Sequence, residues 1–153
     1  MANFRDPSLL NSCILLMDVG AGRPLGCFSM RRTDLDDHIR ELMKPFAHFG
    51  ASAIEHSVFA STDNAAFMAE GVPNLIMLQD ESSYFPVHHT ISDTVDKGES
   101  RDFATCAATL AAAAYSIADS VSRFGRRLSS EDVKKMAAES KVDVQWRAAG
   151  IWR

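Results

Sequence analysis

The sequence predicts an α/β protein, a three-layer α/β/α sandwich around a mostly parallel sheet. Short continuous apolar runs recur along the chain, and segments with apolar residues at helical spacing separate them. Such runs are typical of strands buried on both faces, and their alternation with helices is typical of parallel sheets. The chain has 153 residues, of which 46% are hydrophobic and 24% charged, so it is large enough for one well-packed domain.

In the first half of the chain, apolar runs predict three strands, at 13–17, 26–30 and 53–59. A helix is predicted over 33–49, where apolar residues follow helical spacing. Thr33 is its expected N-cap, Pro45 is expected to kink it or end it early, and Gly50 is expected to close the segment.

The second half continues the alternation. The predicted elements are a short helix capped by Ser61 or Thr62 and ended by Gly71, a strand at 72–78, a polar loop at 79–98, and helices at 100–124 and 129–140. Ser129 or Ser130 is the expected N-cap of the last helix. We expect residues 1–124 to form the main domain and residues 125–153 a helical C-terminal extension. Trp146 and Trp152 are expected to dock on the body or on parts absent from this sequence.

Composition and charge exclude several classes of partner. The formal net charge of −4 argues against a surface built for nucleic acid, so no nucleic-acid partner is expected. No apolar run approaches the roughly 20 residues that a membrane-spanning helix needs, so no membrane partner is expected either. The sequence begins with polar residues and shows no signal peptide.

Two histidines, His88 and His89, lie in the polar loop, and Asp93 lies four residues after the second. A neutral imidazole is a good zinc ligand, and a nearby carboxylate can orient it or bind a second metal. The alternative is that the histidines are simply solvated and that Asp93 caps a turn. Spacing alone leaves both interpretations open.

Asp18 directly follows the first apolar run, where a carboxylate needs solvent, a cation or hydrogen-bond donors. Its alternative role is an Asx-turn toward Gly20. In parallel sheets, ligands bind beyond the carboxyl ends of the strands. We therefore expect Asp18 and the histidine loop to lie at the same edge. Asp63, in contrast, is expected to cap the short helix rather than to bind a ligand.

Three segments resemble the di-zinc aminopeptidase family, which contains carboxypeptidase Q (plasma glutamate carboxypeptidase) and secreted bacterial leucyl aminopeptidases. These are the apolar run ending MDVG at 17–20, STDNAAFMAEGVP at 61–73, and HHTISDTVD at 88–96. The resemblance covers about residues 13–123 in the right order. It implies that Asp18 binds one zinc ion and His89 the other, with His88 beside the tetrahedral intermediate and Asp93 shaping the loop.

The family's remaining site residues lie upstream of these segments: a histidine ligand, a bridging aspartate, and two glutamates that act as general base and zinc ligand. Before Asp18 the sequence contains only Asp6 of these residue types. The mechanism needs two metals about 3.5–4 Å apart and a carboxylate base. The resemblance thus predicts a C-terminal half, in the form of a fragment, a mis-split gene product or one half of a two-chain assembly.

The expected function is therefore that of a zinc-dependent exopeptidase acting on peptides or dipeptides, inactive in this form alone. Amino-, carboxy- and dipeptidase action stay open. The missing N-terminal half, or self-association, is the expected protein partner. Relatives in the family are secreted or periplasmic, so the resemblance suggests that location for this chain. The sequence itself shows no targeting signal. The alternative function is a non-catalytic scaffold or interaction domain that retains the peptidase fold.

Overall fold

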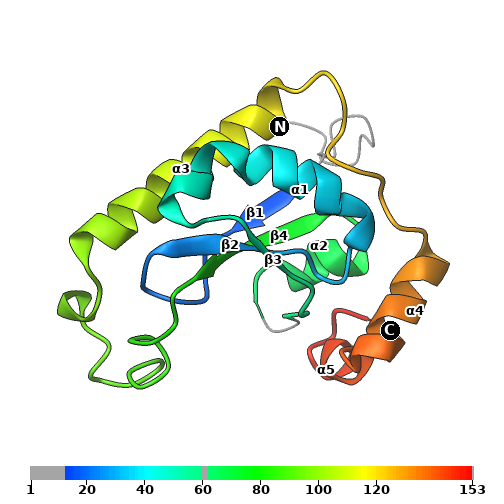
Figure 1. Ribbon diagram of the computed structural model, residues 1–153. Coiled ribbons are helices and arrows are strands. Elements are labelled where there is room, and N and C mark those ends of the chain that lie inside the picture. The colour runs from blue at the N-terminus through cyan, green and yellow to red at the C-terminus, as the bar shows by residue number, and fades with distance from the viewer. Residues whose placement is uncertain (1–12, 60–61, 153) are drawn as a thin grey trace, which may run out of the picture.

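The computed structural model describes residues 13–59 and 62–152 and has an α/β fold (Figure 1). Its four strands form one mixed sheet in the order β1–β4–β2–β3. They are β1 (Ile14–Leu16), β2 (Pro24–Phe28), β3 (Ala53–Glu55) and β4 (Asn74–Gln79). The pairs β1–β4 and β2–β3 are parallel, whereas β2–β4 is antiparallel. The predicted α/β class is confirmed, and the parallel character holds for the outer pairs of the sheet.

The strands lie where the apolar runs predicted them, with different ends. β3 stops at Glu55, four residues before the predicted end. The backbone N–H of Ser29 donates to the carbonyl of Glu55 at 2.8 Å, just beyond the end of β2. Beyond it the side chain of His56 lies 2.7 Å from the hydroxyl of Ser29.

The helix predicted over 33–49 consists of three parts: the 3-10 helix η1 (Thr33–Leu35), α1 (Asp36–Met43) and the 3-10 helix η2 (Lys44–Phe49). Pro45 lies in the first turn of η2, as expected for a residue that ends an α-helix, and Gly50 closes the segment at φ 85°. Thr33 is not an N-cap. It is the first residue of η1, and the preceding backbone bends through Met30 and Arg31 instead.

The remaining helices are α2 (Ala65–Ala69), α3 (Ser100–Asp119), α4 (Ser130–Ser140) and α5 (Asp143–Ala148), with a short 3-10 helix η3 (Val95–Lys97) in the histidine loop. Asn64 is the N-cap of α2, while Thr62 hydrogen-bonds to the Asn64 side chain and Ser61 lies outside the described residues. α3 ends five residues before the predicted boundary. No helix of the described ranges is long and apolar enough to span a membrane.

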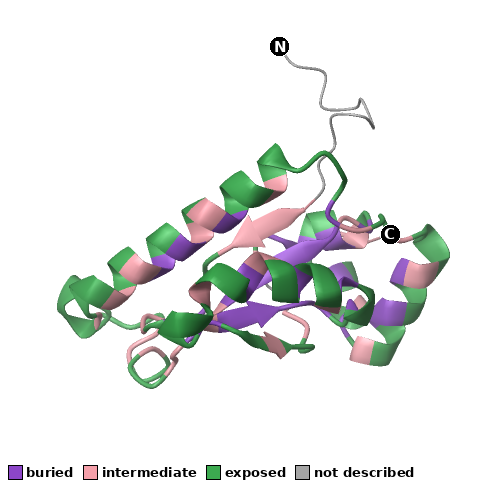
Figure 2. Ribbon diagram, turned by 45° about the horizontal axis from the view of Figure 1, so that its top comes forward, coloured by how far each residue is buried: buried purple, intermediate pink, exposed green. Residues whose placement is uncertain are grey.

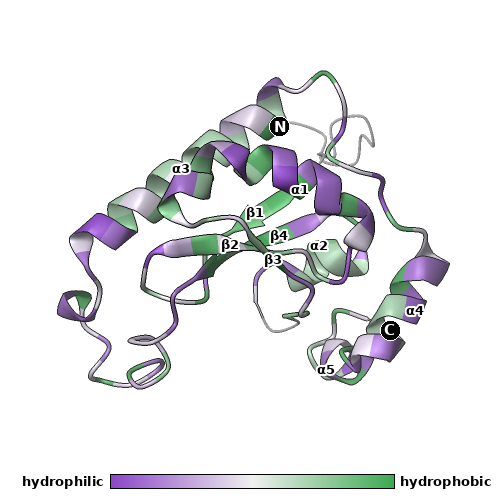
Figure 3. Cartoon of the chain, viewed as in Figure 1, coloured by the Kyte–Doolittle hydropathy of each residue, from purple (hydrophilic) through white to green (hydrophobic). Residues whose placement is uncertain are grey.

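Each face of the sheet packs against a different set of helices, because alternate strand residues point to opposite faces. The central strands β2 and β4 are mostly buried, β1 and β3 are less so, and the helices turn polar residues outward (Figures 2 and 3). The first core lies beneath α1 and α3 and comprises Cys27, Leu35, Ile39, Met43, Ala51, Leu75 and Phe124. The second core joins the other face of the sheet to α2, α4 and α5, and comprises Phe28, Met30, Ala65, Met68, Ile76, Val133, Met136, Ala137, Val142 and Trp146.

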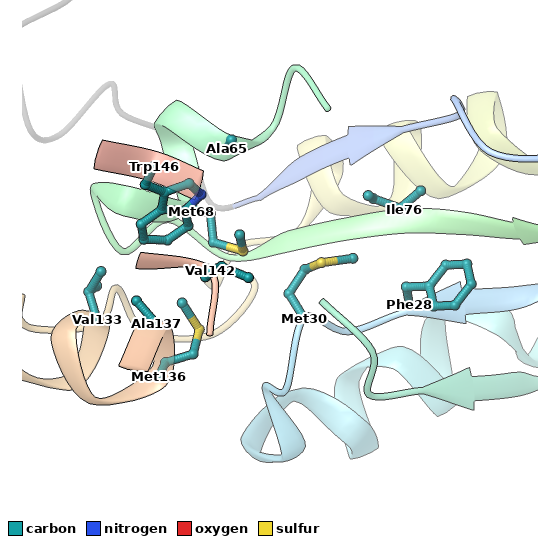
Figure 4. Close-up of a cluster of buried hydrophobic side chains, with 10 residues drawn as sticks. All are labelled: Phe28, Met30, Ala65, Met68, Ile76, Val133, Met136, Ala137, Val142 and Trp146. Atoms are coloured by element: carbon teal, nitrogen blue, oxygen red, sulfur yellow. The ribbon is translucent and has the colours of Figure 1, made fainter. Parts of the chain in front are cut away.

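Trp146 anchors the C-terminal helices in the second core (Figure 4). Its side chain is fully buried, and its ring lies 5.6 Å from that of Trp152. Of the two predicted docking places, the structure shows the body of the domain. The helix that carries Trp146, α5, was not predicted, because a six-residue segment shows too little periodicity to be recognised.

The three cysteines are free thiols. Burial raises the pKa of Cys13 and of Cys27 to about 12, so neither thiol is a nucleophile at neutral pH. Cys106 lies in the buried stripe of α3 and contacts Gln79, so it packs in the core.

The start of α4 is the best-defined helix cap in the described residues. The hydroxyl of Ser129 accepts from the N–H of Asp132 at 3.1 Å, and the Asp132 carboxylate accepts from the N–H of Ser129. We expect Ser129→Ala to lower the free energy of unfolding by about 1 kcal/mol, measured by urea denaturation. Ser130→Ala is the matched control, since Ser130 is already inside the helix. Equal losses in the two variants would contradict the capping role.

Candidate functional site at the carboxyl ends of β1 and β4

The candidate site lies where β1 and β4 end. The two strands are parallel, so residues that follow them meet at one edge of the sheet. Asp18 lies two residues after β1, and the histidine loop begins directly after β4. The predicted common edge is therefore confirmed by the strand pairing.

The connection that carries Asp18 crosses the end of β4 before entering β2. Two backbone hydrogen bonds hold it there, from Gly22 N–H to the Asp80 carbonyl at 3.0 Å and from Asp80 N–H to the Arg23 carbonyl at 2.9 Å. A Cβ atom at Gly20 would lie 2.7 Å from Cβ of Gln79, and one at Gly22 would lie 2.6 Å from Cβ of Asp80. The glycines permit this close crossing.

Gln79, the last residue of β4, connects this crossing segment to α3. Its buried amide nitrogen contacts the Gly22 carbonyl at 3.2 Å and Cys106 Sγ at 3.4 Å. Cys106 also contacts the Gly22 carbonyl, at 3.3 Å. The segment that bears Asp18 thus rests on a rigid strand and a long helix.

Tyr84 joins Asp18 to the histidine loop. Its hydroxyl donates to the backbone carbonyl of Asp18 at 3.2 Å. Partial burial raises the pKa of Tyr84, and the negative charges of Asp18, Asp93 and Glu81 raise it further. The tyrosine therefore stays protonated and keeps its donor, and three carboxylates lie close enough to act on it.

The histidine loop is a series of tight turns. The backbone N–H groups of Val87 and His88 both donate to the carbonyl of Tyr84, at 3.1 and 2.9 Å. His89 has a left-handed backbone, with φ 57°. A non-glycine residue in that region is uncommon and often marks a constrained functional loop.

The rings of the loop stack in sequence. The Tyr84 and His88 ring centroids lie 4.7 Å apart, and those of His88 and His89 lie 3.8 Å apart at an interplanar angle of 25°. His88 is half-buried within this stack, whereas His89 and Asp18 are exposed. Contacts through Tyr84 and His88 thus link the two predicted metal ligands, which come from separate elements of the fold.

The donor set is chemically suited to zinc but small. A carboxylate and an imidazole are both zinc ligands, whereas a catalytic zinc takes three protein ligands. Within residues 13–59 and 62–152, no group of three or more His, Cys, Asp or Glu side chains is placed to hold a metal ion. These residues alone do not complete a zinc site.

Sequence reasoning missed the role of Tyr84. The available signal was its spacing of four residues from His88, which in a compact turn brings two rings together. The contact with Asp18 carried no local signal, since 66 residues separate the two positions.

Comparisons with protein-family models, with curated proteins and with solved structures find no match for this chain.

Proposed function

We propose that this chain carries part of the catalytic centre of a metal-dependent exopeptidase, within a three-layer α/β/α domain that has a mostly parallel sheet. Asp18 and His89 would each bind one of two zinc ions. His88 would donate a hydrogen bond to the oxygen that gains negative charge when a peptide carbonyl is attacked. The substrates would be peptides or dipeptides.

The observation that carries this proposal is the contact of Tyr84 with both halves of the site. Tyr84 donates to the Asp18 backbone and packs on His88, which stacks on His89. An edge that carries both an exposed carboxylate and an exposed imidazole suits metal binding better than either group alone. The bridging carboxylate and the general base would come from outside the described residues, from an N-terminal half or a second chain.

Zinc binding by the isolated chain is expected to be weak and to depend on His89. A complete structural zinc site contributes about 10–16 kcal/mol, so two ligands should give roughly half of that, a dissociation constant between about 1 and 200 µM. Calorimetric titration with zinc measures it. We expect His89→Ala and Asp18→Asn each to weaken binding by about tenfold or more.

The matched control is His48→Ala, which removes an exposed imidazole in η2, outside the histidine loop. This variant should bind zinc as the unmodified chain does. If His48→Ala and His89→Ala lose affinity equally, zinc binds to surface histidines in general and the proposed ligand role is wrong.

Catalysis is tested separately from zinc binding. The isolated chain is expected to hydrolyse no aminoacyl or dipeptide reporter with zinc present. The reason is that the family's general base lies upstream of the segments that resemble it. The decisive assay uses the chain joined to whatever segment is encoded in frame directly upstream of Met1. Zinc-dependent release of a terminal amino acid, abolished by His89→Ala and retained by His48→Ala, supports the exopeptidase. Absence of hydrolysis by that extended chain overturns it.

A non-catalytic interaction domain is the second candidate, and one observation favours it. Three large apolar side chains of the histidine loop are exposed: Phe85 by 58%, Ile91 by 99% and Val95 by 88%. Exposed apolar groups gathered on one loop are typical of protein-binding surfaces. Binding of a protein at this loop without any hydrolysis by the extended chain would favour the scaffold.

A further inference from the structure

A cavity lies at the edge of the sheet opposite the candidate site. β2 is antiparallel to β4, so β2 and β3 both end away from Asp18 and the histidine loop. The cavity there has a volume of about 420 Å³, within the usual range for small-ligand sites. One wall is the turn at 31–34 after β2, a second is His56 after β3, and the third is α4.

The cavity lining is rich in cations on a protein of net charge −4. Arg31, Arg32, Arg126 and Lys135 line it, together with the carboxylates Asp34, Asp132 and Glu139. Each carboxylate pairs with an arginine: Asp34 with Arg32 at 2.8 Å, Asp132 with Arg126 at 3.1 Å, and Glu139 with Arg31 at 3.5 Å.

One cation is left over. Lys135 has no ion-pair partner in the part of the chain that the structure describes. The pairs made by Arg31 and Arg126 are also substantially exposed, and exposed ion pairs stabilise a protein little. A ligand anion can therefore compete for these cations at small cost.

The burial and hydrogen bonds of Arg32 indicate which kind of ligand the cavity suits. Its side chain is only 5% exposed, and its Nε and Nη2 atoms donate to Asp34 and to the Arg126 carbonyl. No hydrogen bond of Nη1 occurs within the described ranges, although Arg32 lines the cavity. A buried guanidinium with an unused donor suits an oxyanion, whose oxygens match its planar fork.

The backbone that presents these arginines is strained. Met30 and Arg31 both have left-handed backbones, at φ 52° and 60°. Burial of Met30, whose sulfur accepts from the Phe59 N–H at 3.4 Å, holds the turn in place. Strain of this kind persists where the surrounding structure enforces it, and it is concentrated at ligand sites.

His56 lines the cavity, and two polar contacts hold its ring in place. Its Nδ1 lies 2.7 Å from Ser29 Oγ, and its Nε2 lies 3.6 Å from a carboxylate oxygen of Asp36. This resembles a serine–histidine–aspartate arrangement, but Ser29 is fully buried and does not line the cavity. The hydroxyl therefore orients the ring and is not a nucleophile.

We propose that this cavity binds a small ligand through an oxyanion, a phosphate or a carboxylate group, held by Arg31, Arg32 and Lys135. The site is separate from the proposed peptidase edge and does not depend on it. An oxyanion would satisfy the free Nη1 donor of Arg32 and pair with the surplus charge of Lys135.

The test is a titration of ¹⁵N-labelled protein with inorganic phosphate and, separately, with succinate, at constant ionic strength. The expected result is saturable shifts of the backbone amides at 31–34 and of the Arg32 side chain. The tighter of the two probes identifies the oxyanion class. Absence of saturable shifts with either probe, up to a concentration of about 10 mM, overturns the proposal.

Matched lysine variants locate the site. Lys135→Gln is expected to weaken binding about tenfold, the usual effect of losing one charge-assisted hydrogen bond. Lys134→Gln removes the same charge from the adjacent position of α4, and Lys134 does not line the cavity. The Lys134→Gln variant should bind the oxyanion as tightly as the unmodified chain does. Equal weakening by both variants would show general charge attraction only and would overturn the site.

Discussion

Replacement of Trp146 by alanine is expected to lower the free energy of unfolding by about 3–5 kcal/mol, the range for deleting a buried aromatic side chain. Trp146, a residue of α5, is fully buried in the second core together with residues of α2 and α4. Its removal leaves a cavity at the point where the C-terminal helices dock on the sheet. Urea unfolding followed by far-UV circular dichroism measures the loss.

Two control variants separate packing from other effects. Trp146→Phe should cost less, about 1–2 kcal/mol, because it fills part of the space and removes an indole N–H. That N–H is buried without a hydrogen-bond partner in the described residues. Val144→Ala changes an exposed residue of the same helix and should be nearly neutral. A loss in Trp146→Ala no larger than in Val144→Ala would show that α5 contributes no docking energy.

Gly26→Ala is expected to destabilise the protein by about 3 kcal/mol or more, at the upper end for overpacked sites. A Cβ atom at this position would lie 1.9 Å from the Ala53 carbonyl oxygen and 2.7 Å from its backbone nitrogen. Backbone atoms cannot rotate away as a flexible side chain can, so β2 and β3 would have to separate. Thermal or urea unfolding detects the change.

Gly150→Ala is the control for the backbone conformation alone. Gly26 and Gly150 both have a positive φ, of 153° and 69°, but no atom lies within 4 Å of a Cβ added at Gly150. Its expected cost is about 1–2 kcal/mol. If both variants lose the same stability, the close approach of β2 and β3 contributes nothing beyond backbone strain.

Much of the candidate site could be predicted from local pattern. The apolar run before Asp18 and the run before the histidine loop both became strands, and their parallel pairing brought their ends together. Strand burial and the carboxyl-end rule suffice for this result. The contact that unites the site, from Tyr84 to Asp18, could not be predicted because it joins side chain and backbone across separate loops.

The sequence by itself determined the α/β class, the order of strands and helices, and the edge where Asp18 meets the histidine loop. Hydrophobic periodicity and helix-capping residues act over a few positions. They can therefore be recognised in the sequence without knowledge of the tertiary structure. Only the tertiary structure decided that β2 runs antiparallel to β4, that Trp146 lies in a helix, α5, and that cations from three segments line one cavity. These features depend on which distant surfaces pack together, and that choice is made by the whole core rather than by any local segment.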